Sequence, residues 1–193
     1  KASLFNETKP NNFGISSFRS LYSKVNEGLN KIQGRISKEV KAELFFIEEN
    51  WSGFSNEDIP KGLIHGDYFP DNVFFQSDTV RGVFDFYFSC NDFYLYDLVI
   101  AINAWCWTGN EINVKKMAAM IKGYEFHRPL NNAEKNAFNI FMRAATMRFF
   151  LTRSIDWLNH QEDAINKLKD PLEYLKIMEF HQNKEGFDDY GLE

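Results

Sequence analysis

The side chains best suited to chemistry lie between residues 65 and 85. The segment begins with His65-Gly66-Asp67, continues to Asn72 five residues after Asp67, and reaches Asp85 in the next strand. Phosphoryl transfer needs a carboxylate beside the attacking hydroxyl and hard oxygen ligands for the Mg²⁺ that accompanies nucleotide phosphates. Two aspartates and an asparagine arranged around one loop therefore predict phosphoryl transfer.

Short strands are expected to position these side chains. Residues 62–65 read as a buried strand, and residues 66–71 read as a loop. Residues 72–76 and 80–86 are rich in Val and Phe and are separated by Ser77-Asp78, which predicts a β-hairpin. The loop would hold Asp67, while the hairpin would present Asn72 and Asp85 at a fixed spacing. Asp71, next to Pro70, is expected to be a turn residue.

Helical patterns dominate the rest of the chain. Apolar spacing and capping residues predict helices over Ser16 to Lys31, Val40 to Trp51, Leu95 to Trp105 with Asn91 or Asp92 as N-cap, Asn113 to Tyr124, a long helix opened by Asn131 with Glu134, and a helix after Asp170-Pro171. We expect Lys1 to Asn12 to be an extended lead-in and Lys184 to Glu193 to be frayed. The predicted class is α+β, mainly α: a helical domain with a small β-hairpin insert.

Composition excludes several classes of protein. The chain has 193 residues, a net charge of −5, 44% hydrophobic and 17% aromatic residues, which is enough to build a core. The acidic balance argues against a nucleic-acid partner. No signal peptide is recognisable, and the most apolar stretch, residues 94–107, is too short and too polar to span a membrane. Cys90 and Cys106 are expected to be buried free thiols in a cytoplasmic protein.

The segment from His65 to Asp85 resembles the catalytic region of the aminoglycoside phosphotransferase-like kinases, which are relatives of protein kinases. The resemblance implies that Asp67 is the catalytic base, that Asn72 and Asp85 are Mg²⁺ ligands beside ATP, and that His65 is a structural loop residue. Gly66 stands where protein kinases have Arg, and Phe86-Tyr87 stands where they have Phe-Gly. These departures favour a small-molecule acceptor over a protein.

Further blocks resemble the homoserine kinases of this group. They are residues 85–92, 96–98, 103–107, 148–153, 156–159 and 170–175. This resemblance extends over most of the chain and implies phosphorylation of the hydroxyl of L-homoserine by ATP, a step of threonine biosynthesis.

Homoserine is a zwitterion, so its site should offer a carboxylate for the ammonium group and a cation for the carboxylate. Asp92, Asp97, Arg148 and Arg153 are the candidates. Each has an alternative: Asp92 as a helix cap, Asp97 as the structural partner of an Arg, and the two arginines as surface salt bridges. Trp105, Trp107, Phe149 and Phe150 are expected to be mainly core residues.

The residues before the catalytic loop lack the features of a nucleotide clamp. They read as helices, and Gly14, Gly28 and Gly34 do not form a phosphate loop. We therefore expect residues 1–193 to form the C-terminal lobe of a kinase-like phosphotransferase whose N-terminal lobe is absent. Such a lobe alone would bind Mg-ATP weakly and turn over slowly, and it would expose a surface that could promote self-association.

Two other functions stay open. The same fold could phosphorylate choline, an aminoglycoside or another small alcohol, and a choline acceptor would require an aromatic cage. A non-catalytic interaction domain is the third possibility, against which the intact Asp67, Asn72 and Asp85 argue.

Overall fold

The computed structural model describes residues 8–34, 36–51, 53–54, 58–109, 111–160 and 168–192. They form two compact units. We call Lys1–Asn11, Phe54–Met142 and Lys184–Glu193 the loop unit, and Asn12–Gly53 with Arg143–Asn183 the helical unit. The predicted class, α+β and mainly α, is confirmed. Within the described residues, no helix combines the length and the apolar content needed to cross a membrane.

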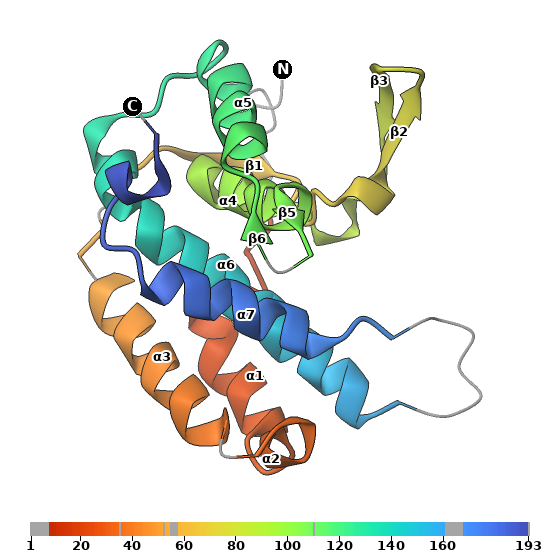
Figure 1. Cartoon of the computed structure of the whole chain (residues 1–193), viewed down its shortest axis with the longest axis vertical. Coiled ribbons are helices and arrows are strands. Elements are labelled where there is room, and N and C mark those ends of the chain that lie inside the picture. Colours follow the sequence, from red (N-terminus) through yellow and green to blue (C-terminus); the bar gives the residue numbers. More distant parts are fainter. Residues whose placement is uncertain are drawn as a thin grey trace. The chain divides into compact units, whose positions relative to one another are not determined.

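In the part of the loop unit that the structure describes, there are three two-stranded antiparallel sheets and two complete helices (Figure 1). Its strands pair as β1 (Lys61–Ile64) with β4 (Cys90–Phe93), β2 (Val73–Gln76) with β3 (Thr79–Val83), and β5 (Trp107–Thr108) with β6 (Glu111–Ile112). Its helices are α4 (Tyr94–Trp105), α5 (Val114–Glu125) and the first part of α6 (Asn132–Leu158). Figure 1 shows the β2–β3 hairpin projecting away from α4 and α5.

The core of the loop unit is built on α4. Leu95, Ile100 and Ile102 are fully buried, as are Phe138 and Phe141 of α6. Such burial on nearly all sides explains why α4 is apolar almost throughout. The predicted hairpin is confirmed, although β3 ends at Val83 and the chain turns into a short 3-10 helix over residues 86–88.

The described residues of the helical unit contain helices but no strand. The helices are α1 (Phe18–Val25), α2 (Leu29–Ile32), α3 (Ile36–Trp51), the second part of α6 and α7 (Pro171–Gln182). α3 ends at Trp51 as predicted but begins at Ile36, four residues before the predicted Val40. α7 begins where the Asp170-Pro171 pair predicts it, and Asp170 accepts a hydrogen bond from the Leu172 N–H at 2.9 Å. A buried ion pair joins Arg143 of α6 to Glu43 of α3 at 2.6 Å.

The sequence prediction is wrong in detail for the first helix and for the residues just before α4. The helix expected over residues 16–31 is interrupted between α1 and α2, where Gly28 takes the N-cap position and a Cβ would collide with Leu158. β4 was not foreseen, because its polar residues 91 and 92 hide the strand pattern. The N-cap of α4 is consequently Phe93, and neither Asn91 nor Asp92.

The C-terminal segment is ordered rather than frayed. Phe187, Tyr190 and Leu192 are buried, and the Tyr190 hydroxyl accepts a hydrogen bond from the amide of Asn139 at 3.0 Å. Aromatic burial against Phe138 therefore outweighs the polar composition that suggested fraying. The capping box of Asn131 and Glu134 is confirmed, with reciprocal hydrogen bonds of 2.8 and 3.1 Å.

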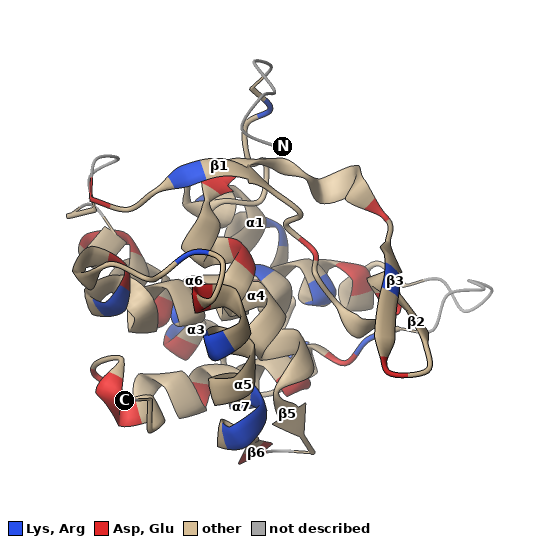
Figure 2. Cartoon of the chain, turned by 90° about the horizontal axis from the view of Figure 1, so that it is seen from above, with Lys and Arg blue, Asp and Glu red and all other residues tan. Residues whose placement is uncertain are grey.

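Figure 2 shows that the β2–β3 hairpin carries little charge. Its aromatic side chains are largely exposed, with 60% of Phe74 and 43% of Phe75 accessible to solvent. Phe149 and Phe150 are core residues, as predicted, whereas Trp105 and Trp107 are only half-buried. Cys90 and Cys106 are free, buried thiols, as predicted.

Candidate active site

The loop between β1 and β2 is organised around the buried imidazole of His65. The Asp67 N–H donates to His65 Nδ1 at 3.2 Å, so the ring proton belongs on Nε2, which lies 3.0 Å from the carbonyl oxygen of Phe84. The ring also packs against Phe86, with centroids 4.8 Å apart. These contacts place His65 as a structural link between the loop and the residues on both sides of Asp85.

Asn72 connects Asp67 to the hairpin. Its side-chain amide donates to the backbone carbonyl of Asp67 at 2.8 Å and to the Asp67 carboxylate at 3.1 Å. Its own carbonyl accepts from the N–H of Phe84 at 3.1 Å. The structure therefore brings Asp67 and Asn72 into direct contact and ties the backbone of Asn72 to the residue before Asp85.

Asp85 sits in an unusual backbone conformation with an exposed side chain. Its φ and ψ are both 61°, in the left-handed region that non-glycine residues seldom occupy. No described residue forms a hydrogen bond or ion pair with its carboxylate. Such strain persists only where the surrounding structure imposes it, and it is common at ligand sites.

Asn72 and Asp85 carry the kinds of oxygen atom that a divalent cation binds. Because the Asn72 NH₂ group is used by Asp67, its amide oxygen is left as a hard ligand, and Asp85 offers a carboxylate. The described residues contain no group of three or more His, Cys, Asp or Glu side chains that could hold a metal alone. A cation held here would therefore need additional oxygen ligands, such as phosphates or water.

Asp97 holds the backbone of the loop from α4. One carboxylate oxygen accepts from the His65 N–H at 3.0 Å, and the other accepts from the Gly66 N–H at 2.8 Å. Both contacts are with backbone N–H groups and give Asp97 a structural role, while its place in the acceptor site stays a prediction. Gly66 has φ +75°, and a Cβ there would lie 2.8 Å from the carbonyl oxygen of Phe88, so the turn requires glycine.

Tyr68, the residue after Asp67, forms an aromatic pair with Trp105 of α4. The indole N–H of Trp105 donates to the backbone carbonyl of Tyr68 at 2.9 Å, and the two rings stack with centroids 6.1 Å apart. Burial, and secondarily the negative charge of Asp97, raise the pKa of Tyr68, so its phenol is protonated at neutral pH.

Asp92 is engaged by its own surroundings. One carboxylate oxygen accepts from the Asn11 amide at 2.6 Å, and the other accepts from the N–H of Phe93, the N-cap of α4, at 2.8 Å. Asp92 is therefore not the helix cap that the sequence suggested. These contacts favour a local structural role over binding of the acceptor.

The two candidate arginines belong to the helical unit and are both buried; a salt bridge forms at Arg153, but its guanidinium is buried rather than on the surface. Arg153 of α6 pairs with Glu173 of α7 at 2.7 Å, which accounts for its charge. Arg148 lies over the rings of Phe13 and Phe149, at 5.5 and 4.6 Å from their centroids. Binding of the substrate carboxylate by Arg148 stays a prediction.

Sequence reasoning placed the proposed chemical residues around this loop but did not predict how Asp97 and Trp105 hold its backbone. Asp97 was noticed because a carboxylate inside an apolar helix needs a partner, yet that partner is backbone N–H rather than an arginine. Trp105 was assigned to the core, and nothing in the sequence distinguishes a packed indole from one whose N–H is used.

Comparison with known proteins identifies the class. The profile described as the phosphotransferase enzyme family matches residues 24–130, a range that contains the entire loop and Asp85. The chain belongs to this family.

The curated relatives that match along nearly the whole chain carry the name homoserine kinase. The chain is 42% identical over 185 residues to the homoserine kinase of Xanthobacter autotrophicus, which covers 95% of the chain and 56% of that protein. It is 42% identical over 186 residues to those of Rhodopseudomonas palustris and Rhodospirillum rubrum, covering 96% of the chain and 56% and 57% of those proteins. The chain thus spans little more than half the length of these relatives.

Proposed function

We propose that this chain carries the catalytic loop of an enzyme that transfers the γ-phosphoryl group of ATP to the hydroxyl of L-homoserine. The contact between Asn72 and Asp67, with the Asn72 backbone bound to Phe84, supports the proposal most directly. These contacts link the proposed base to one proposed cation ligand and to the residue that precedes the other.

Asp67 would orient the acceptor hydroxyl and take its proton. Its carboxylate is half-buried and is steadied by the Asn72 amide, while its N–H and carbonyl are held by His65 and Asn72. A base that is fixed in this way contributes by positioning, which is the main source of rate in phosphoryl transfer.

Asn72 and Asp85 would hold Mg²⁺, whose chemistry when bound is to neutralise charge on the phosphates of ATP. The left-handed backbone of Asp85 turns the chain into the 3-10 helix of residues 86–88, and the packing of Phe86 on His65 fixes that turn beside the loop. The two ligands thus depend on the same histidine for their relative placement.

Homoserine is proposed as the acceptor because three relatives at 42% identity bear the name homoserine kinase. We further propose that these residues form the catalytic lobe, and that the nucleotide clamp is supplied by chain outside the sequence printed here. The buried free thiols Cys90 and Cys106 suit a reducing compartment, which supports a cytoplasmic location.

The test is acceptor profiling on the full-length protein. ADP release is measured with Mg-ATP and either L-homoserine, choline, an aminoglycoside or L-serine, and the phosphorylated product is identified by mass spectrometry. We expect kcat/KM for homoserine to exceed that for every other acceptor by at least about 100-fold.

Calorimetry separates the remaining alternatives. Mg-ATP should bind with a measurable enthalpy, and the binding should weaken in a variant with Asp85→Ala. Preference for another alcohol would overturn the acceptor assignment. Failure of the full-length protein to bind Mg-ATP would overturn the kinase assignment and favour an interaction domain.

A further inference from the structure

Helix α4 contacts the catalytic loop at two places, on either side of Asp67. Near its start, Asp97 binds the N–H groups of His65 and Gly66. At its last residue, Trp105 donates its indole N–H to the carbonyl of Tyr68 at 2.9 Å. The base therefore lies between two backbone segments that are both attached to one helix.

The partners of the carbonyl groups of residues 67–69 show why the hydrogen bond from Trp105 matters. The carbonyl of Asp67 accepts from the Phe69 N–H at 2.8 Å, and that of Phe69 accepts from the Asn72 N–H at 3.0 Å. Both bonds are internal to the loop. The bond from Trp105 to the Tyr68 carbonyl instead fixes this stretch to the rigid body of α4.

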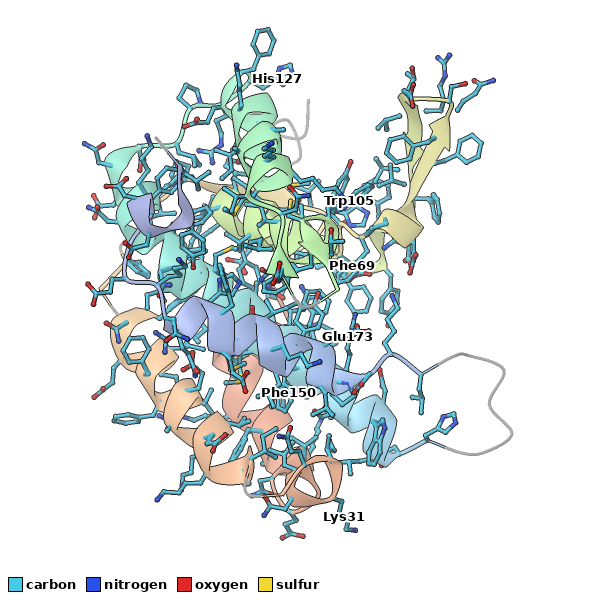
Figure 3. All side chains as sticks on the ribbon, viewed as in Figure 1. Lys31, Phe69, Trp105, His127, Phe150 and Glu173 are labelled. Carbon is cyan, nitrogen blue, oxygen red and sulfur yellow. The ribbon has the colours of Figure 1, made fainter. Side chains whose placement is uncertain are left out.

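The indole ring also reaches the hairpin. It stacks on Tyr68, with an angle of 29° between the ring planes, and it packs edge-on against Phe75 of β2 with centroids 5.9 Å apart. Phe75 lies three residues after Asn72, which directly precedes β2. Figure 3 shows Trp105 at the end of α4 that faces the base of the hairpin.

We infer that Trp105 is a positioning residue, which fixes Asp67 relative to Asn72 and to strand β2, which begins at the next residue. The kinetic effect expected from this inference rests on the proposed function, whereas the contacts of Trp105 are independent of it. Its hydrogen bond orients the peptide group between Tyr68 and Phe69, and its ring sets the spacing between the loop and β2. Trp105 need not touch substrate or nucleotide.

The informative variant is Trp105→Phe, which keeps an aromatic ring and removes the N–H donor. In the full-length protein, we expect kcat for homoserine-dependent ADP release to fall about threefold to tenfold, the range that one neutral hydrogen bond allows. KM for homoserine and for Mg-ATP should stay within about twofold, because no binding group is lost.

Trp157→Phe is the matched control. Trp157 is 40% exposed on α6, lies in the helical unit, and makes none of the three contacts described for Trp105. This control should leave both kinetic constants unchanged. A Trp105→Phe variant with the kcat of the control would overturn the inference, as would one whose loss is entirely in KM.

Amide hydrogen exchange separates failure of this inference from failure of the proposed function, because it needs no substrate. Exchange in peptides covering residues 65–72 should be faster in Trp105→Phe than in Trp157→Phe, while exchange in α5 stays the same. Equal exchange in the loop would overturn the inference whatever the acceptor proves to be. If Trp105→Phe does not fold, Phe75→Leu carries the same test with a smaller expected loss of kcat.

Discussion

Asp97 offers the most direct way to perturb the loop without touching a reacting group. Its two carboxylate oxygens accept from the N–H groups of His65 and Gly66 at 3.0 and 2.8 Å. In Asp97→Asn, one oxygen remains as an acceptor, and the new NH₂ group faces the other N–H, a donor against a donor. That N–H loses its partner in a half-buried position.

An unsatisfied donor of this kind costs about 1–3 kcal/mol. If the whole cost falls on the active arrangement of the loop, kcat decreases roughly 5- to 150-fold, since each 1.36 kcal/mol is a factor of ten. Asp97→Ala leaves both N–H groups without partners, so the cost is about twice as large, and part of it should appear as lower stability. KM for Mg-ATP should change little.

The assay is steady-state ADP release by the full-length protein, with thermal unfolding measured on the same samples. Asp78→Asn is the control, because it removes one negative charge from the exposed tip of the hairpin. Wild-type kcat in Asp97→Asn, at unchanged stability, would refute the reasoning. A purely electrostatic effect of the lost charge would instead appear in Asp78→Asn as well.

Three further predictions concern stability. Gly66→Ala should destabilise the protein by more than about 1 kcal/mol in urea unfolding, because an L residue resists the φ of +75° and its Cβ meets the Phe88 carbonyl. Asp170→Ala should cost about 1 kcal/mol in the same measurement through loss of the α7 N-cap. Burial, opposed by Lys116, raises the pKa of Cys106 from 9.0 to about 11. The folded state therefore favours the protonated thiol, and its contribution to stability is complete below pH 9 and declines between pH 9 and 11. Unfolding of wild type and Cys106→Ala across this range measures that decline as a difference.

Each of these has a matched comparison. Gly123→Ala, in the interior of α5 with no atom within 4 Å of the added Cβ, should instead stabilise by about 0.5–1 kcal/mol. Equal effects at the two glycines would contradict the backbone argument. Glu179→Ala, late in α7, should cost less than Asp170→Ala. A stability difference between wild type and Cys106→Ala that is constant with pH would contradict the shifted pKa of that thiol.

Local rules predicted the elements that carry the site. The hairpin followed from alternating apolar residues with a turn at Ser77-Asp78, and the start of α6 followed from the capping box of Asn131 and Glu134. These signals are contained within a few residues, so a sequence displays them directly.

Features that depend on distant residues could not be predicted in this way. β4 pairs with β1 across nearly thirty residues of chain, and its polar sequence has no strand pattern. The C-terminal segment is ordered because Phe187 and Tyr190 find an aromatic partner in α6. The side chains of Asp97 and Trp105 bind backbone groups of the loop, and such contacts produce no pattern in the sequence of the loop itself.

Asp67 carries the central claim, and its removal tests that claim most directly. In the full-length protein, Asp67→Ala should lower kcat for homoserine-dependent ADP release by about 100- to 10,000-fold, while calorimetric binding of Mg-ATP stays within about threefold of wild type. Asp78→Ala, assayed in parallel, should behave like wild type. An Asp67→Ala enzyme that retains wild-type turnover would contradict the assignment of Asp67 as the base, and with it the chemistry proposed for the loop.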